Sequence, residues 1–359
     1  MEQATVSEVP RLVALGGPAD RPYPPSWIDR IMTAVQRLPV PYGVAYVIFF
    51  LLEAAVMHTL GWLDGSLPPL SFDPLYLLFP LWLWGPLAIM TYLDEVALHA
   101  LQEFQPLLEE HEDEIPRLQY ELTTLPARSV WISGLWWTGV FVVLMYIGFP
   151  TIVREYSYGP LAVASSWIFG LFSFVTGSAV YFHTIRQLRL VSRILGLVER
   201  VNLFRLDPVY AFARVTAKTG VSWLLLTGAT LIVFPLRLIN VTVVALYLTQ
   251  VVFALGAFVL PLWNVHQRLV DEKRRLLAAV NRRLEATIHR LHQALDGDEL
   301  ARVKEIDTAL GGLGSERTVL AGIPTWPWST ATLSGFVSAL VLPVALFLIQ
   351  LALRNLLGV

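Results

Sequence analysis

Glu53 is the residue of this chain whose type and position most clearly permit chemistry. It is the only carboxylate in the interior of a long apolar run, within Ile48 to Val56. If that run crosses a membrane, an ionisable group inside it is costly and is by default a candidate functional site. Its carboxyl group could bind a cation, carry a proton, or stay neutral and hydrogen-bonded to a neighbouring helix. The last of these roles is purely structural and is the simplest interpretation.

Gln250 and Gln350 are the other long polar side chains within apolar runs. Side-chain amides inside a membrane usually join helices, and each such hydrogen bond contributes well under about 1 kcal/mol on average. Packing is therefore the default role for both glutamines.

The seven histidines of the chain do not form a recognisable metal-binding pattern. His289 and His292 are three residues apart on a predicted helix and could share a metal ion. Because no third ligand accompanies them, the simpler interpretation is that both lie on a solvent-exposed face of the helix. A zinc-dependent membrane hydrolase would need several histidines and an aspartate within the apolar runs, and only His58 lies well within one. The chain has no cysteine, which excludes disulfides, iron–sulfur clusters and a cysteine nucleophile. Nucleophile elbows and nucleotide-binding loops are also absent, so we expect neither an enzyme nor a metal or cofactor.

The composition is that of an integral membrane protein. Of 359 residues, 55% are hydrophobic and 15% are charged, against about 25% charged in an ordinary soluble domain. A helix needs about 20 mostly apolar residues to cross the hydrocarbon core. Seven runs of this kind predict an all-α, multi-pass protein, and they are 43 to 62, 74 to 93, 129 to 150, 161 to 183, 219 to 236, 241 to 264 and 330 to 353.

The distribution of basic residues predicts the orientation of these spans. Connections on one side of the predicted membrane carry 23 of the lysines and arginines, and the other side carries only Arg154, Arg237 and Arg354. Because positive charge is retained on the cytoplasmic side, we expect a cytoplasmic amino terminus and an outer carboxyl terminus. Arginine outnumbers lysine 23 to 3, a compositional hint of a prokaryotic genome, so we expect a prokaryotic plasma membrane.

The cytoplasmic side is expected to hold most of the folded mass outside the membrane. Residues 1–40 form a leader with a short interfacial amphipathic helix, in which Trp27, Ile31, Val35 and Leu38 lie on one side and Asp29, Arg30 and Arg37 elsewhere. Residues 41–359 form the seven-helix domain, which includes cytoplasmic helical segments 94–128, 186–218 and 266–328. The apolar repeat after the sixth span predicts one continuous helix from about 241 to 296.

The cytoplasmic segments differ in charge. Segment 94–128 has nine acidic and two basic residues, whereas 186–218 has seven basic and two acidic residues. Each predicted helical extension also carries an apolar stripe, so we expect the extensions to pack together beneath the bilayer. The alternative is that the charged faces are simply solvated, since exposed ion pairs stabilise little.

A proline- and tryptophan-rich segment precedes the last span. It contains Pro324, Trp326, Pro327 and Trp328 within the sequence IPTWPWS. Two prolines stiffen the segment, two tryptophans suit the membrane interface, and Ser329 or Thr330 can cap the helix that follows. We interpret the segment as the hinge, or joint, that positions the seventh span.

The predicted topology, together with the last helix, resembles the insect odorant and gustatory receptor family and its wider superfamily of seven-transmembrane ion channels. Gustatory receptors carry Thr-Tyr, five hydrophobic residues and Gln-Phe in the last helix. Here Pro343 and Val344 are followed by five hydrophobic residues, then Gln350 and Leu351. The spacing and the glutamine match, whereas threonine, tyrosine and phenylalanine are replaced. The resemblance rests chiefly on topology over about 330 residues.

The resemblance implies a tetramer in which the seventh helices surround a cation pore gated by a small molecule. Gln350 would line the outer part of the pore, and Val344 and Phe347 would narrow it further in. Opening would then consist of wetting an apolar constriction. The expected partners are the lipid bilayer, further copies of the chain and an unknown small-molecule ligand, with no nucleic acid.

Two other classes of protein remain open. One is a non-conducting scaffold or sensor that signals through its cytoplasmic helical stalks. The other is a secondary transporter that uses Glu53 as its coupling carboxylate, although the inverted repeats typical of such transporters are not evident.

Overall fold

The computed structural model describes residues 21–155, 157–197, 203, 207–235, 241–297 and 300–357. Of the residues in the described part of the chain, 87% are helical and none lies in a strand. Six helical stretches of this part are long and apolar enough to cross a membrane: Tyr42–Leu63, Pro74–Leu107, Ala127–Ile147, Pro160–Leu197, Pro208–Val233 and Val243–Asp296. The protein is therefore a helical, membrane-embedded protein, and a shorter apolar helix, Thr330–Ala345, follows.

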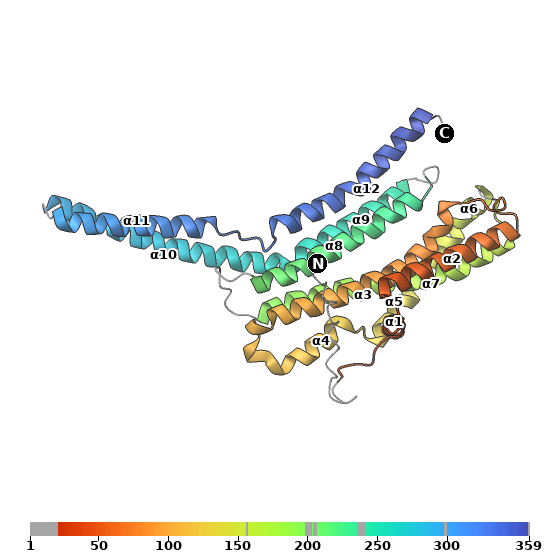
Figure 1. The fold of residues 1–359 in the computed structure, drawn as a ribbon, viewed down its shortest axis with the longest axis horizontal. Coiled ribbons are helices and arrows are strands. Elements are labelled where there is room, and N and C mark those ends of the chain that lie inside the picture. Colours follow the sequence, from red (N-terminus) through yellow and green to blue (C-terminus); the bar gives the residue numbers. More distant parts are fainter. Residues whose placement is uncertain are drawn as a thin grey trace, which may run out of the picture.

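The bundle is built from long helices that run along one common direction (Figure 1). In chain order they are α2 (Tyr42–Leu63), α3 (Leu78–Phe104), α5 (Ala127–Ile147), α7 (Pro160–Leu197), α8 (Asp207–Val233), α9 (Val241–Val259) and α12 (Thr330–Leu357). Helix α3 is central because it packs against α2, α7 and α8. Helix α5 packs against α7, and α8 packs against both α9 and α12.

Shorter elements lie at the two ends of this bundle. They are α1 (Trp27–Gln36), α4 (Ile115–Thr123) and α6 (Phe149–Glu155), with 3-10 turns η2 (Pro74–Leu77), η3 (Gln105–Leu107), η4 (Glu109–Glu114) and η6 (Leu260–Leu262). Helices α10 (Trp263–Asp296) and α11 (Leu300–Gly322) form an antiparallel pair that projects from one end (Figure 1). We call this end the stalk end.

The continuous helical stretch that the sequence predicts from about 241 to 296 is present, with a local 3-10 turn at Pro261. Helix α9 ends at Val259, the turn η6 holds Pro261, and α10 begins at Trp263. Proline has no N–H to donate and its ring clashes with the preceding turn, so an α-helix breaks or bends at this residue.

The helical extensions at the stalk end pack together around one apolar core. Buried residues from all of them contribute, including Leu101, Phe104, Val191, Ile194, Phe212, Val215, Leu262, Val265 and Leu269. The acidic and basic segments also meet, since Arg214 forms an ion pair with Glu103. Arg193 Nη1 lies 3.9 Å from an oxygen of Glu121. The predicted packing of the helical extensions against one another therefore holds for α3, α7, α8 and the beginning of α10.

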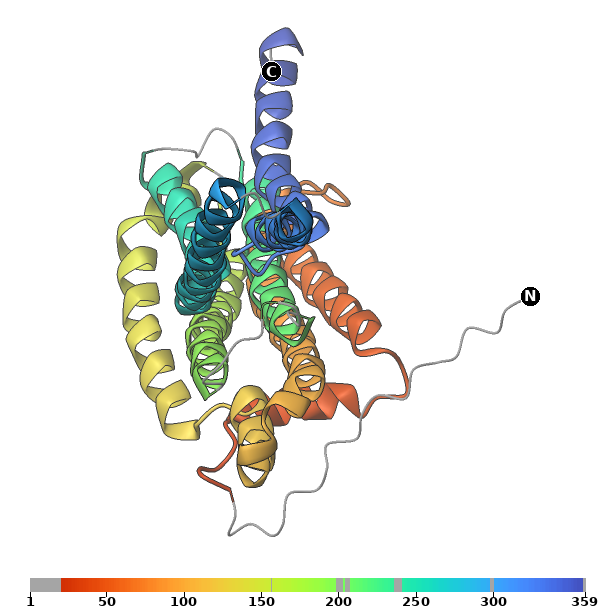
Figure 2. The same cartoon turned by 90° about the vertical axis from the view of Figure 1, so that its left-hand side faces the viewer.

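The rest of α10 behaves differently, because its main partner is α11. Val280 is buried, whereas Ile288 and Leu295 remain exposed. The apolar stripe of α10 is thus only partly covered by a single neighbouring helix. Figure 2 shows the α10–α11 pair nearly end-on, in front of the bundle from which it projects.

Helix α1 buries a different face from the one predicted. Ile28, Met32 and Val35 are buried, and so is Asp29, which the sequence placed on the polar side. Ser26 and Asp29 form a capping box, in which each side chain bonds the other residue's backbone N–H. Asp29 faces inward because it also accepts a hydrogen bond from a second segment of the chain, described below. Residues 1–20 of the predicted leader lie outside the described residues.

Candidate functional site

Glu53 lies on α2 and is 6% exposed. One carboxyl oxygen, Oε2, accepts a hydrogen bond of 2.7 Å from the indole N–H of Trp84 on α3. Phe49 stacks on the same indole ring. The other oxygen, Oε1, is buried without a hydrogen-bond partner. The carboxyl group therefore joins α2 to α3 and leaves one buried oxygen without a hydrogen-bond partner.

Gln250 lies on α9 and accepts a hydrogen bond from the hydroxyl of Tyr181 on α7. The Tyr181 ring stacks on Trp137 and contacts Trp223 and Phe253. The amide thus joins two helices within an aromatic cluster contributed by α5, α7, α8 and α9.

Helix α12 packs on α8 at two close contacts. A Cβ atom at Gly220 would lie 2.6 Å from Phe336, and one at Gly228 would lie 2.8 Å from Pro343. These glycines therefore let α12 approach α8. Of the predicted pore-lining residues, Val344 is 44% exposed. Gln350 and Phe347 belong to α12, but their side chains lie outside the described part.

The segment before α12 is held by side chains of α10. Trp326 stacks on His266 with ring centroids 3.8 Å apart, and Trp328 stacks on Trp326. Pro327, which separates the two tryptophans in the sequence, is buried, and Pro324 is exposed. This segment contacts both α10 and the bundle.

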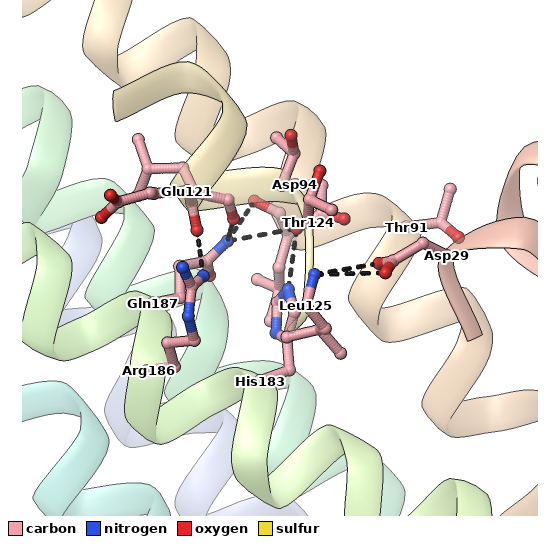
Figure 3. Close-up of polar contacts among 12 residues, drawn as sticks. Asp29, Thr91, Asp94, Glu121, Thr124, Leu125, His183, Arg186 and Gln187 are labelled. Carbon is pink, nitrogen blue, oxygen red and sulfur yellow. Dashed lines mark hydrogen bonds and ion pairs between the residues drawn. The ribbon is translucent and has the colours of Figure 1, made fainter. Parts of the chain in front are cut away.

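A buried polar cluster at the stalk end joins residues that the sequence analysis did not single out (Figure 3). Nε2 of His183 on α7 lies 2.7 Å from a carboxyl oxygen of Asp94 on α3. Both residues are buried. Gln187, one helical turn after His183, makes long hydrogen bonds from its amide nitrogen to Asp94, to the Leu93 carbonyl and to the Leu122 carbonyl.

Two polar side-chain atoms of this cluster make no hydrogen bond within the described structure. His183 Nδ1 and Gln187 Oε1 are buried and have no hydrogen-bond partner. The Asp94–His183 contact ties α3 to α7.

The leader closes over this cluster. Asp29 accepts hydrogen bonds from the Ser26 hydroxyl and from the backbone N–H of Leu125, the latter at 3.2 Å. Burial raises the pKa of Asp29, and the hydrogen bonds that it accepts oppose this rise. Arg186 donates to the Glu121 carbonyl and to the Tyr23 hydroxyl. The leader, the α4–α5 connection and α7 are thus held as one unit.

A weak signal for this cluster is present in the sequence. Asp94 is the first ionisable residue after the predicted run 74 to 93, and His183 ends the predicted run 161 to 183. Two adjacent parallel helices whose apolar runs end at the same level bring such residues to the same depth. The sequence does not reveal that α3 and α7 are neighbours, so the pair could not be inferred from it.

No group of three or more histidine and acidic residues able to hold a metal ion occurs among the residues described. His289 and His292 lie on α10, and both are exposed. Comparison with known proteins finds no matching family model, curated protein or solved structure.

Proposed function

We propose that the protein is a homo-oligomeric, ligand-gated cation channel in which α12 lines the pore. The proposal is carried by the position of α12 at the edge of the bundle. Among the helices, α12 packs extensively only on α8, and its carboxyl-terminal half projects away from the other helices (Figures 1 and 2). A spanning helix held along one face leaves its other faces for lipid or for neighbouring subunits.

The uncovered surface of α12 is mostly apolar. Its large exposed side chains are Leu333, Val337, Val341, Leu342, Val344 and Ile349, and the smaller Thr330, Ser334 and Ser338 are exposed beside them. Val344, Phe347 and Gln350 are spaced by three residues and so fall on one side of a helix. An apolar constriction with one amide beyond it is suited to gating by wetting. The resemblance to seven-transmembrane channels adds the tetrameric state and the small-molecule ligand.

The proposed channel spans the membrane seven times, with α12 as the seventh span. Helix α12 has 28 residues, which at about 1.5 Å per residue is enough to cross the hydrocarbon core. The unequal distribution of basic residues supports a cytoplasmic stalk end, because positive charge is retained inside. A tag fused after Val359 should then be accessible only from outside.

The channel is tested by measuring size in lipid nanodiscs and then cation flux from proteoliposomes. We expect an oligomer that conducts, and Gln350→Leu should change ion permeability while leaving the oligomer intact. Gln250→Leu is the matched control, because it makes the same change on a helix outside the pore. Monomers without flux, or equal permeability in all three proteins, would contradict the proposal.

A scaffold or sensor is the second candidate, because the α10–α11 pair projects beyond the bundle and offers a long surface to other proteins (Figure 1). A secondary transporter is the third, because Glu53 keeps a buried oxygen without a partner. For a transporter, Glu53→Gln should abolish substrate-coupled proton movement, whereas a channel should conduct cations with Gln at this position.

A further inference from the structure

Five aromatic rings form a continuous stack from α10 to α12. His266 stacks on Trp326 at 3.8 Å between centroids, and Trp326 stacks on Trp328 at 4.6 Å. Trp328 stacks on Phe258 of α9 at 4.4 Å, and Phe258 stacks on Phe336 of α12 at 4.0 Å. The interplanar angles of these four pairs lie between 7° and 11°. The stack therefore links the α10–α11 pair to the bundle and to α12.

The sequence of the connecting segment explains why two of the rings lie parallel. Pro327 stands between Trp326 and Trp328, and a residue before proline favours an extended backbone. In an extended chain, side chains two positions apart point to the same side. The two indoles thus face the same way, and each can stack on the next ring.

Both ends of the stack are fixed to helices. At the α10 end, Lys273 Nζ donates to the carbonyl oxygens of Ala321 and Ile323, each at 2.7 Å. His266 Nδ1 lies 3.1 Å from the carbonyl oxygen of Thr325. At the α12 end, Phe336 is 3% exposed and lies over Gly220 of α8. A displacement of α10 therefore moves the connecting segment, and the rings carry the movement to α12.

We infer that this stack is a mechanical linkage by which the position of the α10–α11 pair sets the tilt of α12. The inference rests on the proposed function in so far as tilting of α12 opens a pore. The linkage would provide a second way to open or close the pore. An event at the stalk end would act on α12, in addition to the action of the small-molecule ligand. The linkage itself can be measured without any ion flux.

Spin labels provide that measurement, because the chain contains no cysteine. Cysteines introduced at exposed Thr308 on α11 and Val341 on α12 report the distance between the two helices in full-length protein. We expect one narrow distance distribution. Trp328→Leu should broaden it or shift it, whereas Trp328→Phe, which keeps a ring in the stack, should leave it narrow.

Two controls separate loss of the linkage from loss of the fold. Trp136→Leu removes an indole that is 72% exposed on α5, and it should leave the distribution unchanged. A second label pair at Val56 and Val143, on α2 and α5, should stay narrow in Trp328→Leu. A narrow, unshifted Thr308–Val341 distance in Trp328→Leu would overturn the linkage. A broadened distance in a protein that does not conduct would keep the linkage and contradict the channel instead.

Discussion

Asp94 and His183 are 89 residues apart in the chain, yet a carboxyl oxygen of one lies 2.7 Å from a ring nitrogen of the other. Their contact joins the C-terminal halves of α3 and α7, where the leader and the α4–α5 connection also converge. Loss of either residue would leave a buried polar group without its partner, which is more costly than the loss of both.

The first prediction concerns this pair. Asp94→Leu or His183→Leu alone should destabilise the protein by about 3–5 kcal/mol, because each leaves one buried polar partner uncompensated. The double variant should be more stable than the sum of the two changes predicts. Thermal unfolding of the three variants in detergent measures the coupling. Additive effects would show that the two side chains do not interact.

The close approach of α12 to α8 can be tested at the glycines. Gly228→Ala should destabilise the protein by about 1–3 kcal/mol, because the added methyl group would lie 2.8 Å from Pro343. Gly139→Ala is the matched control on α5, where a Cβ atom meets nothing within 4 Å. Equal unfolding temperatures for the two variants would argue against the α8–α12 contact.

Trp84 is predicted to stabilise Glu53 through its indole N–H. Trp84→Phe removes this donor and leaves both carboxyl oxygens without a partner, so it should cost about 1 kcal/mol. The same substitution should cost less in a Glu53→Leu background, where no carboxyl group needs a donor. Unfolding in detergent compares the four proteins. An equal cost of Trp84→Phe in both backgrounds would mean that the hydrogen bond contributes nothing.

Asp29 should make stability depend on pH. Burial raises its pKa in the folded protein above the ordinary value, so the folded state binds this proton more tightly than the unfolded state does. The resulting stabilisation is complete below the ordinary pKa and is lost as the pH rises through the raised pKa. In the variant Asp29→Asn, the side chain at this position does not titrate, so the variant lacks this pH-dependent contribution to stability.

The unfolding temperature of the wild type minus that of Asp29→Asn should therefore fall as the pH is raised from about 4 towards neutrality. Other carboxyl groups titrate in both proteins and cancel in this difference. A difference that grows with pH would show that hydrogen bonds from Ser26 and Leu125 outweigh burial.

Several features of the fold follow from local sequence. Helix α2, predicted at 43 to 62, begins at Tyr42 and ends at Leu63 in the structure. The prediction is close because a proline precedes the apolar run and a polar residue follows it. The local 3-10 turn at Pro261 was harder to predict, since proline in an apolar run can kink a helix or end it. The inward position of Asp29 depends on the Leu125 N–H, which is supplied by a segment 96 residues away.

By itself the sequence determined a helical, membrane-embedded chain, because only helices satisfy the backbone of an apolar segment in hydrocarbon. It also supplied the polar residues and aromatic rings from which the contacts are built. Tertiary structure decided which of them meet, as Glu53 meets Trp84 and Trp328 meets Phe258. A helix that is apolar on all sides has no amphipathic face to indicate its rotation, so the neighbours of each span were settled only when the helices packed.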